Sequence, residues 1–234
     1  MLCYNKHMKK LLALLVLALV LTGCNAPKEI SEDARRFKEE YESLNGVSNG
    51  YDGNYRTVKI NQDNPFEYAT AEDIVRKMKN GESFIVYFGA NWCPWCRCVI
   101  PFFIEGCAQN KIDKVYYVDV RPDNDLDKDI RDEYSLDDNN EVYLSQQGTP
   151  GYHEFIKMAS DVLEDYSRGK ITSLDGTPFE GAKRVGAPNF IVIEKGKAIR
   201  MSLCTPASLE DPYMILDDRI KQDIRNEIEE LLNG

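Results

Sequence analysis

Two cysteines, Cys93 and Cys96, lie three positions apart and follow closely on an apolar run over 84–88. The run has the length and the continuous apolar character of a strand that is buried on both faces. Where a helix opens at the first cysteine, its unpaired N–H groups and its dipole stabilise the thiolate and lower the pKa of that cysteine. The second cysteine falls on the same helical face and can close a disulfide with the first, which releases a bound partner. The spacing therefore predicts thiol–disulfide exchange, with Cys93 as the nucleophile and Cys96 as the resolving thiol.

Other uses of a Cys-x-x-Cys pair have less support in this sequence. Structural zinc takes four ligands, and neither a second Cys-x-x-Cys nor a pair of neighbouring histidines is present, since the chain has only His7 and His153. No second His or Met ligand stands near the motif, which disfavours copper delivery, and the two histidines give little support for Ser/His/Asp or Cys/His catalysis. A purely structural disulfide would close too short a loop to stabilise much through chain entropy. We expect no metal and no cofactor.

The remaining periodic segments supply the elements that would position the motif. Apolar runs of strand length predict further strands over 56–60, 114–120, 189–193 and 198–203, the last two joined by a hairpin turn at Gly196. Apolar residues at helical spacing predict helices over 70–80, 152–166 and 217–232, the first opening with a capping pattern at Thr70. These elements predict an α/β fold.

The amino-terminal segment has the pattern of a signal peptide. Lys9 and Lys10 precede eleven apolar residues over 11–21, too few to cross a bilayer core, which takes about 20 helical residues. The following Leu21-Thr22-Gly23-Cys24 resembles the lipobox of bacterial lipoproteins, in which the cysteine is diacylated and becomes the new amino terminus. We expect residues 1–23 to be a lipoprotein signal peptide and Cys24 to be lipidated. The mature chain would then be anchored at the cell membrane on its extracytoplasmic face, where disulfides persist.

The composition is globular and acidic, with 234 residues, 43% of them hydrophobic, and a formal net charge of −10. Removal of the signal peptide takes away three lysines and leaves 26 basic against 39 acidic side chains, a net charge of −13. This balance argues against a nucleic-acid partner, because phosphate binding needs clustered Lys and Arg. Residues 24–55 are predicted to form an acidic membrane-proximal spacer. It would carry one amphipathic helix with apolar positions at Ile30, Ala34, Phe37, Tyr41 and Leu44.

The Cys-Pro-Trp-Cys segment resembles the active-site segment of the thioredoxin superfamily. Trp92, directly before the first cysteine, matches that family's tryptophan, and Pro101 matches its helix-kinking proline. Gly186-Ala187-Pro188, which leads into the strand over 189–193, resembles the family's cis-proline loop. The resemblance covers about residues 56–120 and 184–233. Within the superfamily, the lipobox, the acidic spacer and the motif look like the thioredoxin-like lipoproteins of Gram-positive bacteria.

The resemblance implies a thioredoxin-like fold over 56–234, with a central mixed sheet flanked by helices. An insertion at about 121–183 would separate the third strand from the cis-proline loop. It also implies that protein disulfides or dithiols are the substrates, and that a membrane or extracytoplasmic redox partner exchanges electrons with the pair. The implied substrate-binding residues are Trp92, Pro94, Trp95, Ala187 and Pro188, with backbone at Ala187 available to pair with a substrate strand.

This chain departs from the family's pattern at two positions near the motif. Thioredoxins carry a buried aspartate six residues before the first cysteine, where it assists proton transfer at the second, and here that residue is Tyr87. Asp119, near the end of the next strand, is either a substitute or an ordinary strand-end carboxylate. The residue before the cis-proline is usually β-branched in the family, whereas it is Ala187 here, so substrate selectivity should differ.

Five other residues are candidates for a part in the site or in the packing: Cys98, Cys107, Cys204, Arg97 and His153. Cys204 falls beside the predicted disulfide and is a candidate third thiol, although a free thiol or pairing with Cys107 is also open. Cys98 points away from Cys96 on the helix, and Cys107 is most simply a buried small side chain. Arg97 is either a positive charge that stabilises the Cys93 thiolate or a solvated helix residue. His153 heads the helix in the insertion and is a candidate for a catalytic part.

The sequence leaves the direction of electron flow open. The insertion resembles in position the helical insertion of the oxidase DsbA, so a disulfide oxidase is an alternative to a reductase. An alternative of a different class is a surface-anchored binding or transport accessory protein that keeps a thioredoxin scaffold without turnover.

Overall fold

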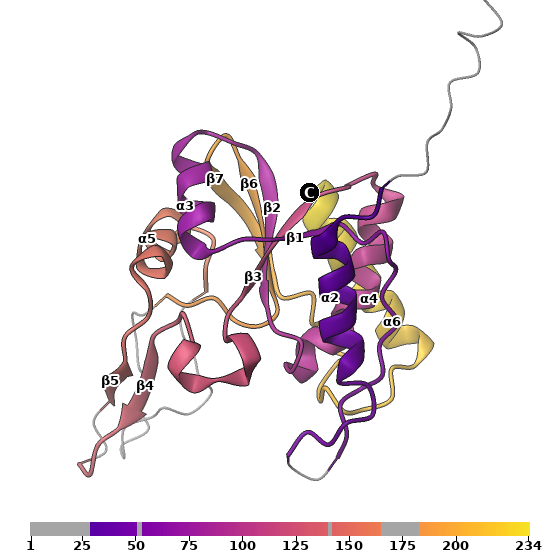
Figure 1. Cartoon of the computed structure of the whole chain (residues 1–234), viewed down its shortest axis with the longest axis horizontal. Coiled ribbons are helices and arrows are strands. Elements are labelled where there is room, and N and C mark those ends of the chain that lie inside the picture. The colour runs from indigo at the N-terminus through magenta and orange to yellow at the C-terminus, as the bar shows by residue number, and fades with distance from the viewer. Residues whose placement is uncertain (1–28, 51–52, 140–141, 165–182) are drawn as a thin grey trace, which may run out of the picture. The chain divides into compact units, whose positions relative to one another are not determined.

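A five-stranded mixed sheet in the order β1-β3-β2-β6-β7 forms the centre of the body made by residues Ser31–Gly234 (Figure 1). The computed structural model describes residues 29–50, 53–139, 142–164 and 183–234. The predicted signal peptide and Cys24 lie outside these residues. Strands β1 (Phe66–Tyr68), β3 (Val115–Asp119) and β2 (Phe84–Gly89) are parallel, and β6 (Asn189–Glu194) and β7 (Lys197–Ser202) continue the sheet antiparallel.

Helices cover both faces of this sheet. Helices α2 (Glu32–Ser43), α4 (Pro94–Gln109) and α6 (Asp218–Asn233) lie on one side, and α3 (Ala71–Lys79) and α5 (Pro150–Ala159) lie on the other (Figure 1). The predicted α/β class with a central mixed sheet flanked by helices is therefore confirmed.

Local sequence signals account for most of these elements. Thr70 and Asp73 form the expected capping box at the start of α3. Gly196 turns the β6–β7 hairpin with a φ of 78°, and a Cβ there would meet the carbonyl oxygen of Met78 at 2.1 Å. Only glycine fits this turn. Helix α5 begins earlier than the predicted 152–166, at Pro150 after its N-cap Thr149, and ends earlier, at Ala159.

Helix α2 belongs to the core, so the prediction of a spacer over 24–55 is wrong from Ser31 onward. The side chains of Ala34, Phe37 and Tyr41 are buried. The Phe37 ring stacks on Phe66 of β1, with 4.0 Å between the ring centroids. The apolar stripe that suggested an amphipathic tether therefore packs against the sheet, where it removes aromatic surface from water.

The predicted strand over 56–60 is also wrong, although its alternating residues Val58 and Ile60 are buried. Its backbone bonds to side chains rather than to another strand. The Val58 N–H donates to Asn45 Oδ1 at 2.9 Å and the Val58 carbonyl accepts from Asn45 Nδ2 at 2.8 Å. The Ile60 N–H donates to Glu42 Oε1 at 2.8 Å. The end of α2 therefore satisfies the backbone groups that a strand partner would otherwise take.

The insertion at about 121–183 contains more structure than its polar sequence suggested. Two short 3-10 turns, Pro122–Asn124 and Leu126–Lys128, lead into an antiparallel hairpin of β4 (Glu133–Leu136) and β5 (Val142–Gln146). Residues 165–182 of the insertion lie outside the described residues.

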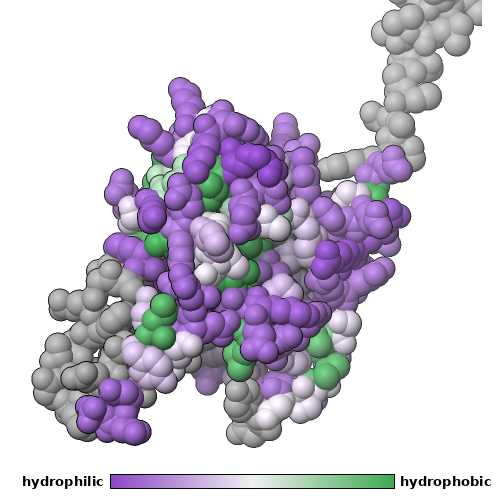
Figure 2. All heavy atoms as spheres, turned by 60° about the vertical axis from the view of Figure 1, so that its left-hand side comes forward, coloured by the Kyte–Doolittle hydropathy of each residue, from purple (hydrophilic) through white to green (hydrophobic). Residues whose placement is uncertain are grey.

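The molecular surface in Figure 2 is mainly hydrophilic, with small, separate hydrophobic areas, as the charged composition leads one to expect.

Replacement of Phe37 by alanine tests whether α2 is part of the core. We expect Phe37→Ala to lower the free energy of unfolding by about 3–5 kcal/mol, because it leaves a cavity among stacked aromatic rings. Urea unfolding followed by circular dichroism measures this loss. The control is Arg35→Ala at an exposed position of the same helix, which should change stability by less than about 0.5 kcal/mol. Equal stability of the two variants would mean that α2 is a tether after all.

Candidate active site

The end of strand β2 and the start of helix α4 place the two motif cysteines. Cys93 is the N-cap of α4 and Pro94 occupies the first turn, where a missing N–H costs no hydrogen bond. The Cys96 N–H donates to Cys93 Sγ at 3.3 Å. The first sulfur is thus held at the positive end of the helix, and the second lies one turn inside.

The loop before β6 closes over the first cysteine. Cys93 Sγ donates to the carbonyl oxygen of Ala187 at 3.0 Å, and the Ala187–Pro188 peptide bond is cis. Segments 94 residues apart in the sequence therefore meet at one sulfur atom. Of the predicted site residues, the structure brings Cys93, Cys96, Ala187 and Pro188 together, while their catalytic and binding roles stay predictions.

The two thiols have opposite electrostatic surroundings. Burial acts to raise the pKa of Cys93, but hydrogen bonds from Cys96 and from the backbone of Trp95, together with the charge of Arg131, outweigh it and leave that pKa below its ordinary value. Burial raises the pKa of Cys96 well above its ordinary value, and the neighbouring Cys93 raises it further. The pair therefore consists of one activated thiol and one protonated, buried thiol.

Arg131 comes from the insertion, and sequence reasoning missed it. Its guanidinium makes two hydrogen bonds to the carboxylate of Asp129, from Nε at 2.9 Å and from Nη2 at 2.8 Å. Both side chains are almost completely buried. This Asp-x-Arg pattern lies some 35 residues from the motif, so nothing local in the sequence connects the charge with Cys93.

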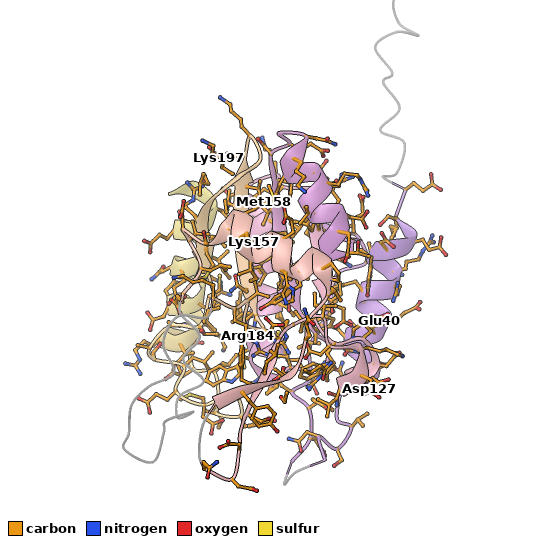
Figure 3. All side chains as sticks on the ribbon, turned by 90° about the vertical axis from the view of Figure 1, so that its left-hand side faces the viewer. Glu40, Asp127, Lys157, Met158, Arg184 and Lys197 are labelled. Carbon is orange, nitrogen blue, oxygen red and sulfur yellow. The ribbon has the colours of Figure 1, made fainter. Side chains whose placement is uncertain are left out.

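Cys93 opens into a cleft of about 710 Å³ between the motif and the insertion. The motif side is lined by Trp92, Pro94, Trp95 and Ala187, and the insertion side by residues of β4, β5 and the preceding turns. Pro188, by contrast, is buried. Arg184 also lines the cleft, lies between α5 and the hairpin in Figure 3, and pairs with Glu133. A molecule that reaches Cys93 Sγ must therefore pass between the indole and proline side chains of the motif and the mostly polar side chains of the insertion.

Trp92 is fixed at the edge of this cleft. Its Nε1–H donates to the Arg121 carbonyl at 3.0 Å, and the Arg121 guanidinium lies 4.0 Å from the centroid of the Trp92 ring. Trp95 is half-buried and faces the cleft. The two indole rings therefore differ, one being pinned to the insertion and the other open to a partner.

Arg97 is completely buried, which contradicts the reading of a solvated helix residue. Its guanidinium donates to the carbonyl oxygens of Arg56, Tyr41 and Asn91 at 2.8, 2.8 and 2.9 Å, and to Asn45 Oδ1 at 2.7 Å. These acceptors lie on α2, on the segment that follows it and on the active-site loop. Arg97 therefore ties α2 to the start of α4.

Tyr87 lies six residues before Cys93, a tyrosine in place of the aspartate of thioredoxins, which this segment resembles. It is completely buried on β2, and its hydroxyl lies 2.8 Å from the hydroxyl of Tyr41. The neighbouring Tyr87 hydroxyl acts to lower the pKa of the Cys96 thiol, against the larger effect of burial. Asp119 accepts the Arg121 N–H at 3.0 Å, and burial raises its pKa to about 6. Asp119 ends β3 and bonds the backbone two residues further on, as an ordinary strand-end carboxylate does.

The remaining cysteines are buried away from the cleft. The Cys98 thiol donates to the Pro212 carbonyl at 3.2 Å. Burial, with a smaller contribution from the neighbouring Cys204, raises the pKa of Cys107 to about 12. Burial also raises the pKa of Cys204 to about 12. Cys204 is completely buried and does not line the cleft at Cys93, and the side chains that shift its pKa besides burial are Ser202 and Glu227. His153 bonds through Nε2 to Asp132 at 2.7 Å and does not line the cleft.

Comparison with known proteins gives one match. The model of a prokaryotic membrane lipoprotein lipid attachment site matches residues 8–25. No curated protein and no solved structure matches the chain. The match supports the expected attachment site at Cys24 and indicates a membrane-anchored lipoprotein. Within the part of the chain that the structure describes, no helix has the length and apolarity needed to span a bilayer.

The difference between the thiols predicts selective alkylation of the reduced protein. At pH 7, iodoacetamide should modify Cys93 well before the other four cysteines of the body, because Cys93 has the lowered pKa and borders the cleft. Its rate should rise with pH through a midpoint below that of an ordinary cysteine thiol and level off once the thiolate is fully formed. Peptide mapping by mass spectrometry measures each site. Faster modification of Cys96 or Cys98 than of Cys93 would contradict the assignment.

Proposed function

We propose that this protein is a membrane-anchored thiol–disulfide oxidoreductase with a thioredoxin-like fold that exchanges disulfides in protein substrates outside the cytoplasm. The observation that carries the proposal is the asymmetric pair at the start of α4. One thiol of lowered pKa lies 3.0 Å from the Ala187 carbonyl, and a second thiol is bonded to it through its backbone N–H. Such asymmetry is what a nucleophile and a resolving thiol require.

In the reductive direction, the Cys93 thiolate attacks one sulfur of a substrate disulfide. The substrate S–S bond breaks, a Cys93–substrate disulfide forms, and the other substrate sulfur leaves as a thiolate. Cys96 then attacks Cys93 Sγ, which forms the Cys93–Cys96 disulfide and releases the second substrate sulfur. The reverse sequence oxidises a substrate dithiol. A redox partner returns the pair to its starting state.

The surroundings of Cys93 support an extended polypeptide as the substrate. The exposed part of the site is a cleft bordered by Pro94 and Trp95 on one side, with the Ala187 backbone beside the sulfur. Indole and proline surfaces offer apolar contact, while backbone next to the reacting atom offers hydrogen bonds to a second chain. The lipid attachment site favours an extracytoplasmic location, where substrate disulfides are stable.

Single cysteine variants test the proposal. The full-length chain in detergent should catalyse the reduction of insulin by dithiothreitol, measured as turbidity. Cys93→Ser should reduce the rate to that of dithiothreitol alone, because the attacking sulfur is lost. Cys96→Ser should instead accumulate a mixed disulfide with insulin, which non-reducing electrophoresis detects.

Cys98→Ser is the matched control. The residue lies in the same helix, but its thiol donates to the Pro212 carbonyl, and a serine hydroxyl can make the same bond. This variant should retain the wild-type rate. If Cys93→Ser instead matched the wild type in every assay, the accessory-protein alternative would replace the oxidoreductase.

A further inference from the structure

We propose that Arg121 binds a carboxylate of the substrate polypeptide, so that the site prefers partners with an Asp or Glu close to the reacting cysteine. This inference rests on the proposed function and concerns the choice of substrate. Four charged side chains line the cleft at Cys93, namely the guanidinium groups of Arg121, Arg131 and Arg184 and the carboxylate of Glu133. Positive charge therefore prevails in the cleft, although acidic side chains outnumber basic ones by 39 to 26 in the chain after residue 23.

Two of these three guanidinium groups already have a carboxylate partner. Arg131 donates two hydrogen bonds to Asp129, from Nε at 2.9 Å and from Nη2 at 2.8 Å. Arg184 donates from Nη2 to Glu133 Oε1. Because the charges within each of these pairs cancel, the third arginine, Arg121, supplies the excess positive charge of the cleft.

The charge of Arg121 is balanced less closely than the other two. Its Nε lies 4.0 Å from Asp129 Oδ2, which is beyond hydrogen-bond distance. Both oxygens of that carboxylate already accept hydrogen bonds from Arg131. Arg121 Nε is buried, and no described residue accepts a hydrogen bond from it. A guanidinium offers several donors in a planar fork that matches a carboxylate, so an incoming acidic side chain is the group that suits it.

The Trp92 ring holds this guanidinium beside the nucleophile. The Arg121 guanidinium lies 4.0 Å from the centroid of the ring, and the Trp92 Nε1–H donates to the Arg121 carbonyl at 3.0 Å. Trp92 directly precedes Cys93 in the chain. The Arg121 side chain is only 17% exposed, so water screens its charge less than that of a surface arginine. A charge fixed in this way can orient a substrate with little loss of side-chain freedom.

The acidic residues that are near Arg121 in the sequence bond to other groups. Asp119 accepts the backbone N–H of Arg121 at 3.0 Å. Asp123 and Asp125 pair with Lys128, at 2.7 and 3.8 Å. None of these three carboxylates is among the described residues that line the cleft. They therefore leave the side of Arg121 that borders the cleft to a partner.

The surroundings of Arg121 favour a carboxylate that belongs to a polypeptide. The cleft has a volume of about 710 Å³ and is also lined by Pro94 and Trp95, which offer apolar contact to the residues beside an acidic side chain. The Ala187 backbone next to Cys93 Sγ offers hydrogen bonds to an extended chain. Three extended residues span about 10 Å. We therefore expect the acidic residue within about three positions of the substrate cysteine.

Seven-residue peptides with a central cysteine, blocked at both termini, test this preference. The cysteine is activated as a 2-pyridyl disulfide. Cys93 attacks the peptide sulfur, the bond between the peptide and pyridyl sulfurs breaks, and the leaving group takes up a proton as pyridine-2-thione, which is measured by its absorbance. Cys96 then gives up its proton, forms the Cys93–Cys96 disulfide and releases the peptide thiol.

A single Glu is placed at each position on either side of the cysteine in turn, with Gln at the same position as the uncharged reference. At one or more positions, the reduced full-length chain in detergent should react about tenfold faster or more with the Glu peptide, because hydrogen bonds between charged groups are the stronger ones. Lys at that position should make the reaction slower than Gln does, because its charge repels the guanidinium.

Three variants keep the test specific to Arg121. Arg121→Gln should reduce the ratio of the Glu rate to the Gln rate to below about twofold, whereas Arg121→Lys, which keeps the charge, should retain a ratio of about threefold or more. Lys128→Gln is the matched control. It removes one positive charge from the same segment at an exposed position outside the cleft, and it should keep the wild-type ratio.

Tryptophan fluorescence gives a readout that needs no reaction. Trp92 and Trp95 are the two tryptophans of the chain, and both line the cleft. Peptides with Ser in place of the cysteine cannot react, so their titration measures binding alone. The Kd of the Glu peptide should be about fivefold lower or more than that of the Gln peptide.

Equal rates for the Glu and Gln peptides at every position would overturn the inference. So would a wild-type ratio in Arg121→Gln, or a loss of the preference in Lys128→Gln. These outcomes leave the proposed function standing. A wild-type chain that reacts with none of the peptides, yet binds the unreactive Glu peptide more tightly than the Gln peptide, would refute the proposed function and retain the carboxylate site. Absence of both reaction and preferential binding would refute the two together.

Discussion

The guanidinium of Arg97 lies inside the protein, hydrogen-bonded to three backbone carbonyls and one amide oxygen. A charge removed from water is tolerated only where hydrogen bonds replace its hydration. Those four acceptors come from α2, from the residues that follow it and from the loop before Cys93. The requirement to satisfy one buried cation therefore fixes α2 against the start of α4. With α2 fixed in this way, the Tyr41 hydroxyl lies beside the Tyr87 hydroxyl.

The pKa values of Cys93 and Cys96 differ because the two residues lie at different depths along α4. Cys93 caps the helix, where N–H groups without intrahelical partners face its sulfur and the cleft gives access to a partner. Cys96 lies one turn deeper among aromatic rings, where burial keeps its proton in place. The insertion adds to this contrast, because Arg131 brings a positive charge to the first sulfur. Helix position, burial and the charge of Arg131 together lower the pKa of Cys93 and leave that of Cys96 well above its ordinary value.

Local patterns predicted the parts of the site that local physics determines. The apolar strand, the helix opening at Cys93, the capping box at Thr70 and the final hairpin each depend on a few neighbouring residues. The resemblance placed Ala187 beside the cysteine pair. The packing of α2 against the sheet could not be predicted, because an apolar stripe does not show which surface it covers. The sequence also could not show that the Asn45 side chain bonds the backbone of Val58 in place of a neighbouring strand. Nor could it show the effect of Arg131 on Cys93, since the two come together only after the insertion folds.

The equilibrium reduction potential of the Cys93–Cys96 pair tests the central claim most directly. It is measured by titrating the full-length chain in detergent against glutathione and dithiothreitol, with alkylation of the free thiols as the readout. We predict a reversible two-electron couple at a potential between those of thioredoxin and DsbA, about −270 and −120 mV. A value near the lower limit would indicate a reductase, and one near the upper limit an oxidase. Absence of a reversible couple between these two cysteines would contradict the account.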